Sequence, residues 1–351
     1  MVCVKPFSYS HISKEDSAYL KGWAILIMIF LHVFGSRAVN MPAYRQLDDI
    51  CYWNGVPLSY CISRFCSICV HLYILLSGYG FYIIYRRKKE KGSGMHTVRR
   101  ILMLLIKVLI IGCLFYPISL FYPQLEWNFA DSVQLFLGYE GNYEWWFLRP
   151  YIIIGLCSPF LLSIFDRRPW LTLCFSFFVY SLTKGFIYFG VHSIPLIFEQ
   201  LFILSPAFFI GAGLAKWGIL SIASKISPPL SKKIVQSAAW IILVLMVFYK
   251  IHFPSGLFDF VIAAIFVLCA IVIKDCLWKR VSRLLVVFGE EATSMWLIHT
   301  FIAIYYWSEF SYSFKYPIVI FVFVVLASFI LSKLITILYN PIRTKLEYLF
   351  A

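Results

Sequence analysis

Two histidines lie inside long apolar segments of the sequence. His32 belongs to the apolar run at 18–36, and His299 belongs to the run at 285–306. An ionisable side chain at bilayer depth is energetically expensive, so such a residue needs partners and is a functional candidate. Because an imidazole titrates near neutral pH, it can take up and release a proton. The two histidines are therefore the first candidates for acid–base chemistry.

Both histidines are expected in the outer half of the membrane. A helix rises 1.5 Å per residue, so His32 lies roughly 16 Å beyond Lys21, and His299 lies roughly 24 Å beyond Arg283. Other charged residues should share this outer layer, although a side chain at a helix end can simply reach water. These residues fall in the first turns of segments counted from the outside: Arg64, Glu144, Arg149, Glu199 and Asp259.

The elements that must position these residues are membrane helices. Hydrophobic residues make up 61% of the 351 positions, and only 14% are charged, against about 25% in an average soluble domain. We therefore predict an all-α, polytopic integral membrane protein of about ten transmembrane helices, each near the 20 residues that a bilayer requires. The predicted spans are 18–36, 58–84, 101–120, 145–165, 170–190, 195–215, 234–251, 257–273, 285–306 and 317–338.

The charged residues between these spans predict the orientation of the chain. Lys and Arg gather in alternate loops, whereas the other loops are mainly acidic, as the positive-inside rule requires of cytoplasmic and external loops. We expect a multi-pass protein of the cell inner (plasma) membrane with both termini cytoplasmic, at 1–17 and 339–351. Since the net charge of +14 comes from these short loops, nucleic acid is not an expected partner.

The spacing of Lys21 and His32 resembles a motif of the first helix in the acyltransferase-3 family of membrane acyltransferases. Further segments resemble family motifs in the same order along the chain. They are HLYILLSGYGFYIIY (71–85), the basic pair before the third span (99–100), WWFLRPYIIIGL (145–156), LSPAFFIGAGLAK (204–216) and FGEEATSMWLIHTFI (288–302). Two positions depart from the family pattern, because proline is absent after Arg100 and Thr300 follows His299.

The resemblance implies one membrane acyltransferase domain over 1–351. It implies O-acylation of a carbohydrate or other envelope hydroxyl, commonly O-acetylation of a surface polysaccharide in polysaccharide biosynthesis, with acyl-CoA (acetyl-CoA) as donor substrate. The expected partners are acyl-CoA, a carbohydrate acceptor (a surface polysaccharide or its lipid-linked precursor) and membrane lipid. Neither a bound cofactor nor a metal is expected.

O-acylation requires a base, because the acceptor hydroxyl must lose its proton as it attacks the thioester. We expect His32 to be this general base, with His299 or Glu144 orienting it or the acceptor. Arg64 or Arg149 is expected to stabilise the developing oxyanion. A covalent acyl-histidine intermediate is an alternative route.

The donor phosphates are expected at the inner end of the spans. Lys21, Arg99 and Arg100 are the predicted donor-binding residues, since cations attract the phosphate groups of acyl-CoA. The alternative interpretation of the basic loop at 86–100 is that it only sets topology.

Two other classes of protein would also explain polar residues in an outer membrane layer. One is a transporter or flippase for a lipid-linked glycan or small anion, and the other is a polysaccharide polymerase. Neither class predicts the spacing of Lys21 and His32 together with the later motifs. Transfer of label from acetyl-CoA to glycan separates an acyltransferase from a transporter.

Overall fold

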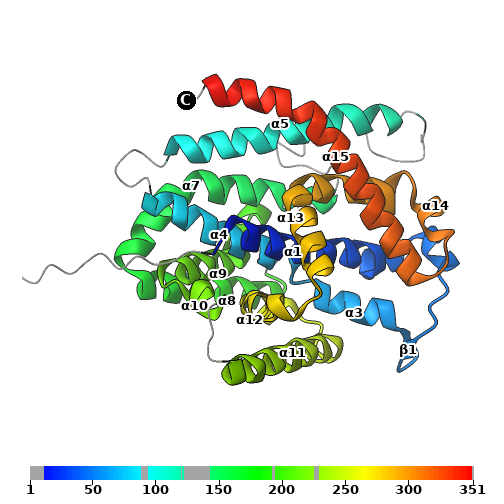
Figure 1. Cartoon of the computed structure of the whole chain (residues 1–351), viewed down its shortest axis with the longest axis horizontal. Helices are drawn as coiled ribbons and strands as arrows, with labels where there is room; N and C mark the ends of the chain where they lie inside the picture. The colour runs from blue at the N-terminus through cyan, green and yellow to red at the C-terminus, as the bar shows by residue number, and fades with distance from the viewer. Residues whose placement is uncertain are drawn as a thin grey trace, which may run out of the picture.

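Long helices occupy all ten apolar ranges of the sequence (Figure 1). The structure, a computed structural model, describes residues 12–87, 94–119, 121, 143–191, 194–224 and 229–349. Five helices run away from the end of the bundle where the chain begins: α1 (Lys14–Phe34), α5 (Gly94–Ser119), α8 (Pro169–Tyr188), α11 (Pro229–His252) and α13 (Lys279–Thr300). Five run back toward it: α4 (Cys69–Arg87), α7 (Leu148–Arg167), α9 (Leu196–Lys216), α12 (Asp259–Ile273) and α15 (Pro317–Leu349).

Shorter elements join these helices. They are α2 (Ser36–Val39), η1 (Pro42–Gln46), β1 (Tyr52–Trp53), β2 (Val56–Pro57), α3 (Leu58–Cys66), η2 (Tyr143–Trp145), α10 (Ile219–Ser224), η3 (Gly256–Phe258), η4 (Lys274–Cys276), η5 (Phe301–Tyr305) and α14 (Ser308–Tyr312). Of these, η5 is one turn of π-helix that continues directly from α13.

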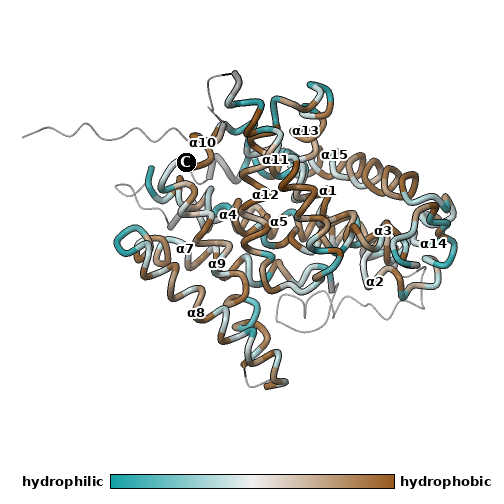
Figure 2. Tube along the Cα trace, turned by 90° about the horizontal axis from the view of Figure 1, so that it is seen from below, coloured by the Kyte–Doolittle hydropathy of each residue, from teal (hydrophilic) through white to brown (hydrophobic). Residues whose placement is uncertain are grey.

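The predicted fold class, an all-α polytopic membrane protein, is confirmed. Within the residues described, eight helical segments are long and apolar enough to cross a membrane. The remaining two predicted spans are also helical, as α5 and α13. Apolar residues cover most of the length of the long helices, and polar residues gather toward their ends (Figure 2).

Two helix boundaries differ from the predicted spans. The helix predicted at 58–84 is interrupted at Ser67, so that α3 and α4 are separate helices. At the other end of the chain, α15 continues to Leu349, through most of the segment expected as a tail. A helix can leave the apolar layer without ending, because its backbone hydrogen bonds remain internal.

Small residues bring α1 and α13 into close contact. A Cβ atom added to Gly22 would lie 1.9 Å from the carbonyl oxygen of Leu285, and one added to Gly289 would lie 1.7 Å from that of Ala18. Only glycine permits such an approach of two helix backbones. The α1–α13 crossing is thus fixed by glycines near the middle of both helices.

A second close crossing holds α4 against α9. Cβ atoms added to Gly78 and Gly211 would lie 2.0 Å and 1.9 Å from the carbonyl oxygens of Phe208 and Leu75, respectively. The bundle interior therefore contains two tightly packed helix pairs.

Cations gather where α1 begins, and we call this side of the molecule the basic end. The described Lys and Arg residues near helix termini on this side include Lys14, Arg86, Arg87, Arg99, Arg100, Arg167, Arg168, Lys216, Lys232, Lys233, Lys274, Lys279 and Arg280. The opposite side, where α1 and α13 finish, we call the histidine end.

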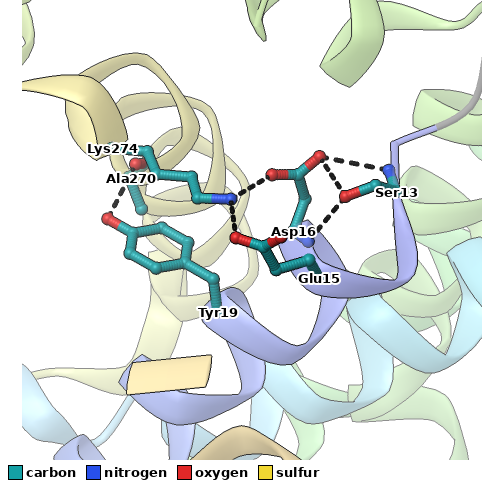
Figure 3. A network of polar contacts seen from close by, with 6 residues as sticks. All are labelled: Ser13, Glu15, Asp16, Tyr19, Ala270 and Lys274. Atoms are coloured by element: carbon teal, nitrogen blue, oxygen red, sulfur yellow. Dashed lines mark hydrogen bonds and ion pairs between the residues drawn. The ribbon is translucent and has the colours of Figure 1, made fainter. Parts of the chain in front are cut away.

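Lys274, the first residue of η4 after α12, ties the first turn of α1 to this end of α12 (Figure 3). Its Nζ donates to Asp16 at 2.7 Å and to Glu15 at 3.3 Å. Asp16 also completes a capping box with Ser13, which satisfies free backbone N–H groups at the start of α1. In addition, the Tyr19 hydroxyl donates to the carbonyl of Ala270 on α12 at 3.1 Å. These contacts set the position of α1 at the basic end.

Short elements hold the histidine end together. Gly35 ends α1, and the hydroxyl of Tyr312 on α14 donates to the carbonyl of Val33 at 2.6 Å. Carbonyl groups in the last turn of a helix need such outside donors. The β1–β2 hairpin turns at Asn54 and Gly55, whose φ values of 48° and 75° suit these two residue types.

Candidate active site

His32 and His299 meet at the histidine end. The Nδ1 atom of His32 lies 2.8 Å from the Nε2 atom of His299, so one imidazole donates a hydrogen bond to the other. The two residues come from the last turns of α1 and α13. Each lies ten residues beyond the glycine of its helix at the α1–α13 crossing, Gly22 or Gly289. Because both helices rise equally from that crossing, the histidines arrive at the same level.

Hydrogen bonds decide which nitrogen of each neutral ring carries the proton. His299 Nδ1 lies 2.7 Å from the carbonyl oxygen of Trp296 and 3.2 Å from that of Met295. A carbonyl only accepts, so His299 Nδ1 carries the proton and His299 Nε2 accepts from His32 Nδ1. The Nε2 atom of His32 then has a free lone pair and can take up a proton.

The two histidines differ in exposure. His299 is fully buried, whereas His32 is partly exposed. His32 is therefore the more accessible of the two rings, and His299 hydrogen-bonds to it from the interior.

A second contact joins the segments that follow α1 and α13, beyond the histidine pair. Arg37 lies on α2, five residues after His32, and Tyr305 ends the π-helical turn six residues after His299. The Nη2 atom of Arg37 donates to the Tyr305 hydroxyl at 3.2 Å. Our sequence prediction missed both residues, since it searched for ionisable groups at membrane depth. Their spacing from the two histidines was the available signal.

Glu144 completes this second contact. Its Oε1 atom lies 2.6 Å from Arg37 Nη1, and its Oε2 atom accepts from the Tyr305 hydroxyl at 2.6 Å. The carboxylate side chain is only 2% exposed, compared with 41% for the side chain of Arg37. Burial raises the pKa of Glu144, although Tyr305 and Arg37 act in the opposite direction. The predicted site residues His32, His299 and Glu144 thus lie at the same end of the molecule.

We expect Glu144→Gln not to reduce the stability of the protein at pH 7. A carboxyl group whose pKa is raised by folding favours the folded state in its protonated form, below its ordinary pKa. That contribution is lost as the pH rises through the raised pKa, so the ionised Glu144 weakens the fold at pH 7. Glutamine removes the charge and keeps an oxygen that accepts from Tyr305.

Thermal unfolding of the purified protein in detergent, measured across pH, tests this expectation. Glu144→Gln should unfold at or above the temperature of the wild-type protein at pH 7, and the difference should shrink toward pH 4.5. A variant that unfolds at a clearly lower temperature at pH 7 would mean that the Arg37–Glu144 ion pair is mainly structural.

Aromatic packing fixes the π-helical turn that carries Tyr305. The ring of Phe301 stacks on Phe115 at 4.6 Å and on Tyr306 at 5.4 Å between centroids. Trp145, next to Glu144, meets the edge of the same ring at 5.9 Å. Because these rings are buried, Tyr305 and Glu144 approach Arg37 from rigid positions.

The two arginines that we predicted for the oxyanion have other surroundings. Arg64 donates to the carbonyl of Ile251 on α11 at 2.9 Å, and its guanidinium lies 5.1 Å from the ring centroid of Tyr60. Arg149 lies in the first turn of α7 and is partly exposed. Neither described contact of Arg64 involves His32 or His299.

The predicted donor-binding residues lie toward the basic end. Lys21 lines a cavity of about 310 Å³ between α1 and α13, together with Lys14 and Glu290. The charge of Arg100 acts on Lys21, and its guanidinium lies 4.4 Å from the ring centroid of Phe81. Arg99 is partly exposed beside Arg100. The structure therefore separates the predicted residues into a group with Lys21 and a group with His32.

Other ionisable residues of the bundle interior have structural partners. Asp259 forms a buried ion pair with Lys250 at 2.7 Å and accepts from Ser67 at 2.9 Å. Lys107 donates to Ser294 on α13 at 3.1 Å. Such partners offset the desolvation of charges in an apolar interior.

Comparison with known proteins identifies a family that the chain matches over most of its length. The model of a family described as an acyltransferase domain matches residues 16–337. No curated protein and no solved structure matches the chain. The matched range includes both histidines, Arg37, Glu144 and Tyr305.

Proposed function

Because the chain belongs to acyltransferase family 3, we propose that this membrane acyltransferase moves an acetyl group from acetyl-CoA to a sugar hydroxyl. The acceptor in this proposal is a cell-envelope polysaccharide or its lipid-linked precursor. The observation that carries the proposal is the hydrogen bond between His32 and His299, since it leaves a lone pair on the more exposed ring.

In the proposed reaction, His32 carries the proton and the two substrates supply all the atoms that are transferred. His32 Nε2 removes the proton of the acceptor hydroxyl as its oxygen bonds to the thioester carbonyl carbon. The tetrahedral intermediate then breaks its carbon–sulfur bond, and the leaving thiolate takes the proton from His32. The products are the acylated sugar and free CoA. His299 keeps its Nδ1 proton throughout, and this N–H donates to the carbonyls of Trp296 and Met295.

In this proposal the donor enters from the basic end, which we take to be cytoplasmic. Lys21 and Arg100 are two like charges near one another at this end, an arrangement that favours a polyanion such as the phosphates of CoA. Lys21 and His32 are eleven residues apart, so they lie on the same face of α1, about 16 Å apart along it. The extended pantetheine arm of the donor would follow this face toward the histidine pair.

Transfer of label tests the proposed function directly. Purified protein in lipid nanodiscs is incubated with acetyl-CoA labelled in its acetyl group and with envelope glycan from cells that lack the protein. We expect labelled O-acetyl groups on the glycan, seen by NMR and removed by mild base, together with one free CoA thiol per group transferred. Movement of glycan or acetyl-CoA across the membrane without a new ester would instead support transport.

A further inference from the structure

The Arg37 side chain is anchored by two partners and is still partly exposed. Glu144 and Tyr305 hold its guanidinium at 2.6 Å and 3.2 Å, respectively. Trp145, next to Glu144, packs against the ring of Phe301, and Tyr305 lies in the same π-helical turn as Phe301. Yet 41% of the Arg37 side chain remains exposed. A partly exposed cation that a buried carboxylate holds in place is preorganised to meet a negative charge.

Chain geometry brings Arg37 close to the proposed base. Gly35 ends α1 three residues after His32, and α2 begins at once, so only one short turn separates His32 from Arg37. The same α1–α13 pairing that joins His32 to His299 also joins Arg37 to Tyr305. The charge of Arg37 acts on the His32 ring.

We infer that Arg37 is a catalytic residue of the proposed acyl transfer. Its guanidinium stabilises the negative charge that forms on the thioester carbonyl oxygen when the acceptor hydroxyl attacks, and Glu144 and Tyr305 are its positioning residues. The inference rests on the proposed function and assigns to Arg37 the role that the sequence suggested for Arg64 or Arg149. When the carbon–sulfur bond breaks, the charge leaves this oxygen and the carbonyl double bond re-forms.

The experiment measures acetyl transfer by Arg37→Ala and Arg37→Lys in nanodiscs, with acetyl-CoA and glycan each varied. Loss of one charge-stabilising group typically lowers kcat by about 10²–10³-fold. We expect a loss of this size for Arg37→Ala, with little change in either KM. Arg37→Lys should fall between alanine and the wild-type protein, because lysine keeps the charge but not the planar fork of donors.

Chemical rescue separates catalysis from structure. Because the Arg37 side chain is partly exposed, added guanidinium ion should enter the space that Arg37→Ala leaves and raise kcat in proportion to its concentration. Arg45→Ala is the matched control, since Arg45 is an exposed arginine of η1 at the same end of the molecule. It should keep wild-type kcat and show no response to guanidinium.

Three results would overturn the inference. The first is a near wild-type kcat for Arg37→Ala. The second is a loss of activity that follows a loss of folded protein and is not rescued. The third is rescue by guanidinium of Arg64→Ala but not of Arg37→Ala. Each of these leaves the proposed function standing, whereas a wild-type protein that transfers no acyl group would refute both.

Discussion

His32→Ala is expected to abolish acyl transfer while the protein still accumulates in the membrane. The variant removes the only lone pair that the histidine pair offers to a substrate. Loss of a general base lowers the rate by about 10²–10⁴-fold. The measurement is the rate of acetyl transfer to glycan per folded molecule, with thermal unfolding as the check on folding. Normal acetate content on the glycan would remove His32 from the mechanism.

Two substitutions of His299 provide the matched comparison. The amide oxygen of glutamine can lie near the position of His299 Nε2 and accept from His32 Nδ1, whereas leucine cannot. His299→Gln should therefore retain measurable activity, and His299→Leu should lose nearly all of it, because His32 can then hold its proton on either nitrogen. Equal activity in the two variants would show that the orientation of His32 does not depend on this hydrogen bond.

Gly22→Ala is also expected to reduce acyl transfer strongly, although it lies about 15 Å from His32 along the helix. A Cβ atom at Gly22 would lie 1.9 Å from the carbonyl oxygen of Leu285, so α1 and α13 must move apart by more than 1 Å. Such overpacking typically costs about 1–3 kcal/mol. A misplacement of 1 Å can reduce the rate about 10²-fold. Acetyl transfer should fall by about this factor in molecules that remain folded.

Other glycines provide controls for packing and for helix propensity. Gly211→Ala disturbs the α4–α9 crossing, where its Cβ would lie 1.9 Å from the carbonyl oxygen of Leu75. It should lower the unfolding temperature but spare the rate per folded molecule. Gly112 and Gly185 have no atom within 4 Å of an added Cβ, so alanine there should be harmless. Wild-type activity in Gly22→Ala would show that the crossing does not set the level of the histidines.

The helices could be predicted from sequence because apolar length alone determines them. A bilayer leaves few alternatives to a helix of about 20 residues, and every predicted span is helical. The break at Ser67 was not predictable, since 58–84 is one continuous apolar run. There, the Ser67 hydroxyl bonds to Asp259, a partner nearly 200 positions away that local sequence cannot reveal.

Site residues could be predicted only where an ionisable side chain lay inside an apolar segment. His32 and His299 stood out among apolar neighbours, but their contact depends on the crossing of α1 and α13. Arg37 did not stand out, because a polar residue just after a helix is ordinary. Its importance comes from Glu144 and Tyr305, and only the folded chain brings these three residues together.

The separation of the paired histidines in sequence has a consequence for biosynthesis. His32 and His299 are 267 positions apart, and a chain is inserted in the order in which the ribosome makes it. The first helix therefore lies in the membrane without its partner helix α13 until nearly the whole protein has been translated. A nascent or truncated product that ends before α13 has His32 without its hydrogen-bonding partner, so the proposed mechanism predicts that such a product is inactive.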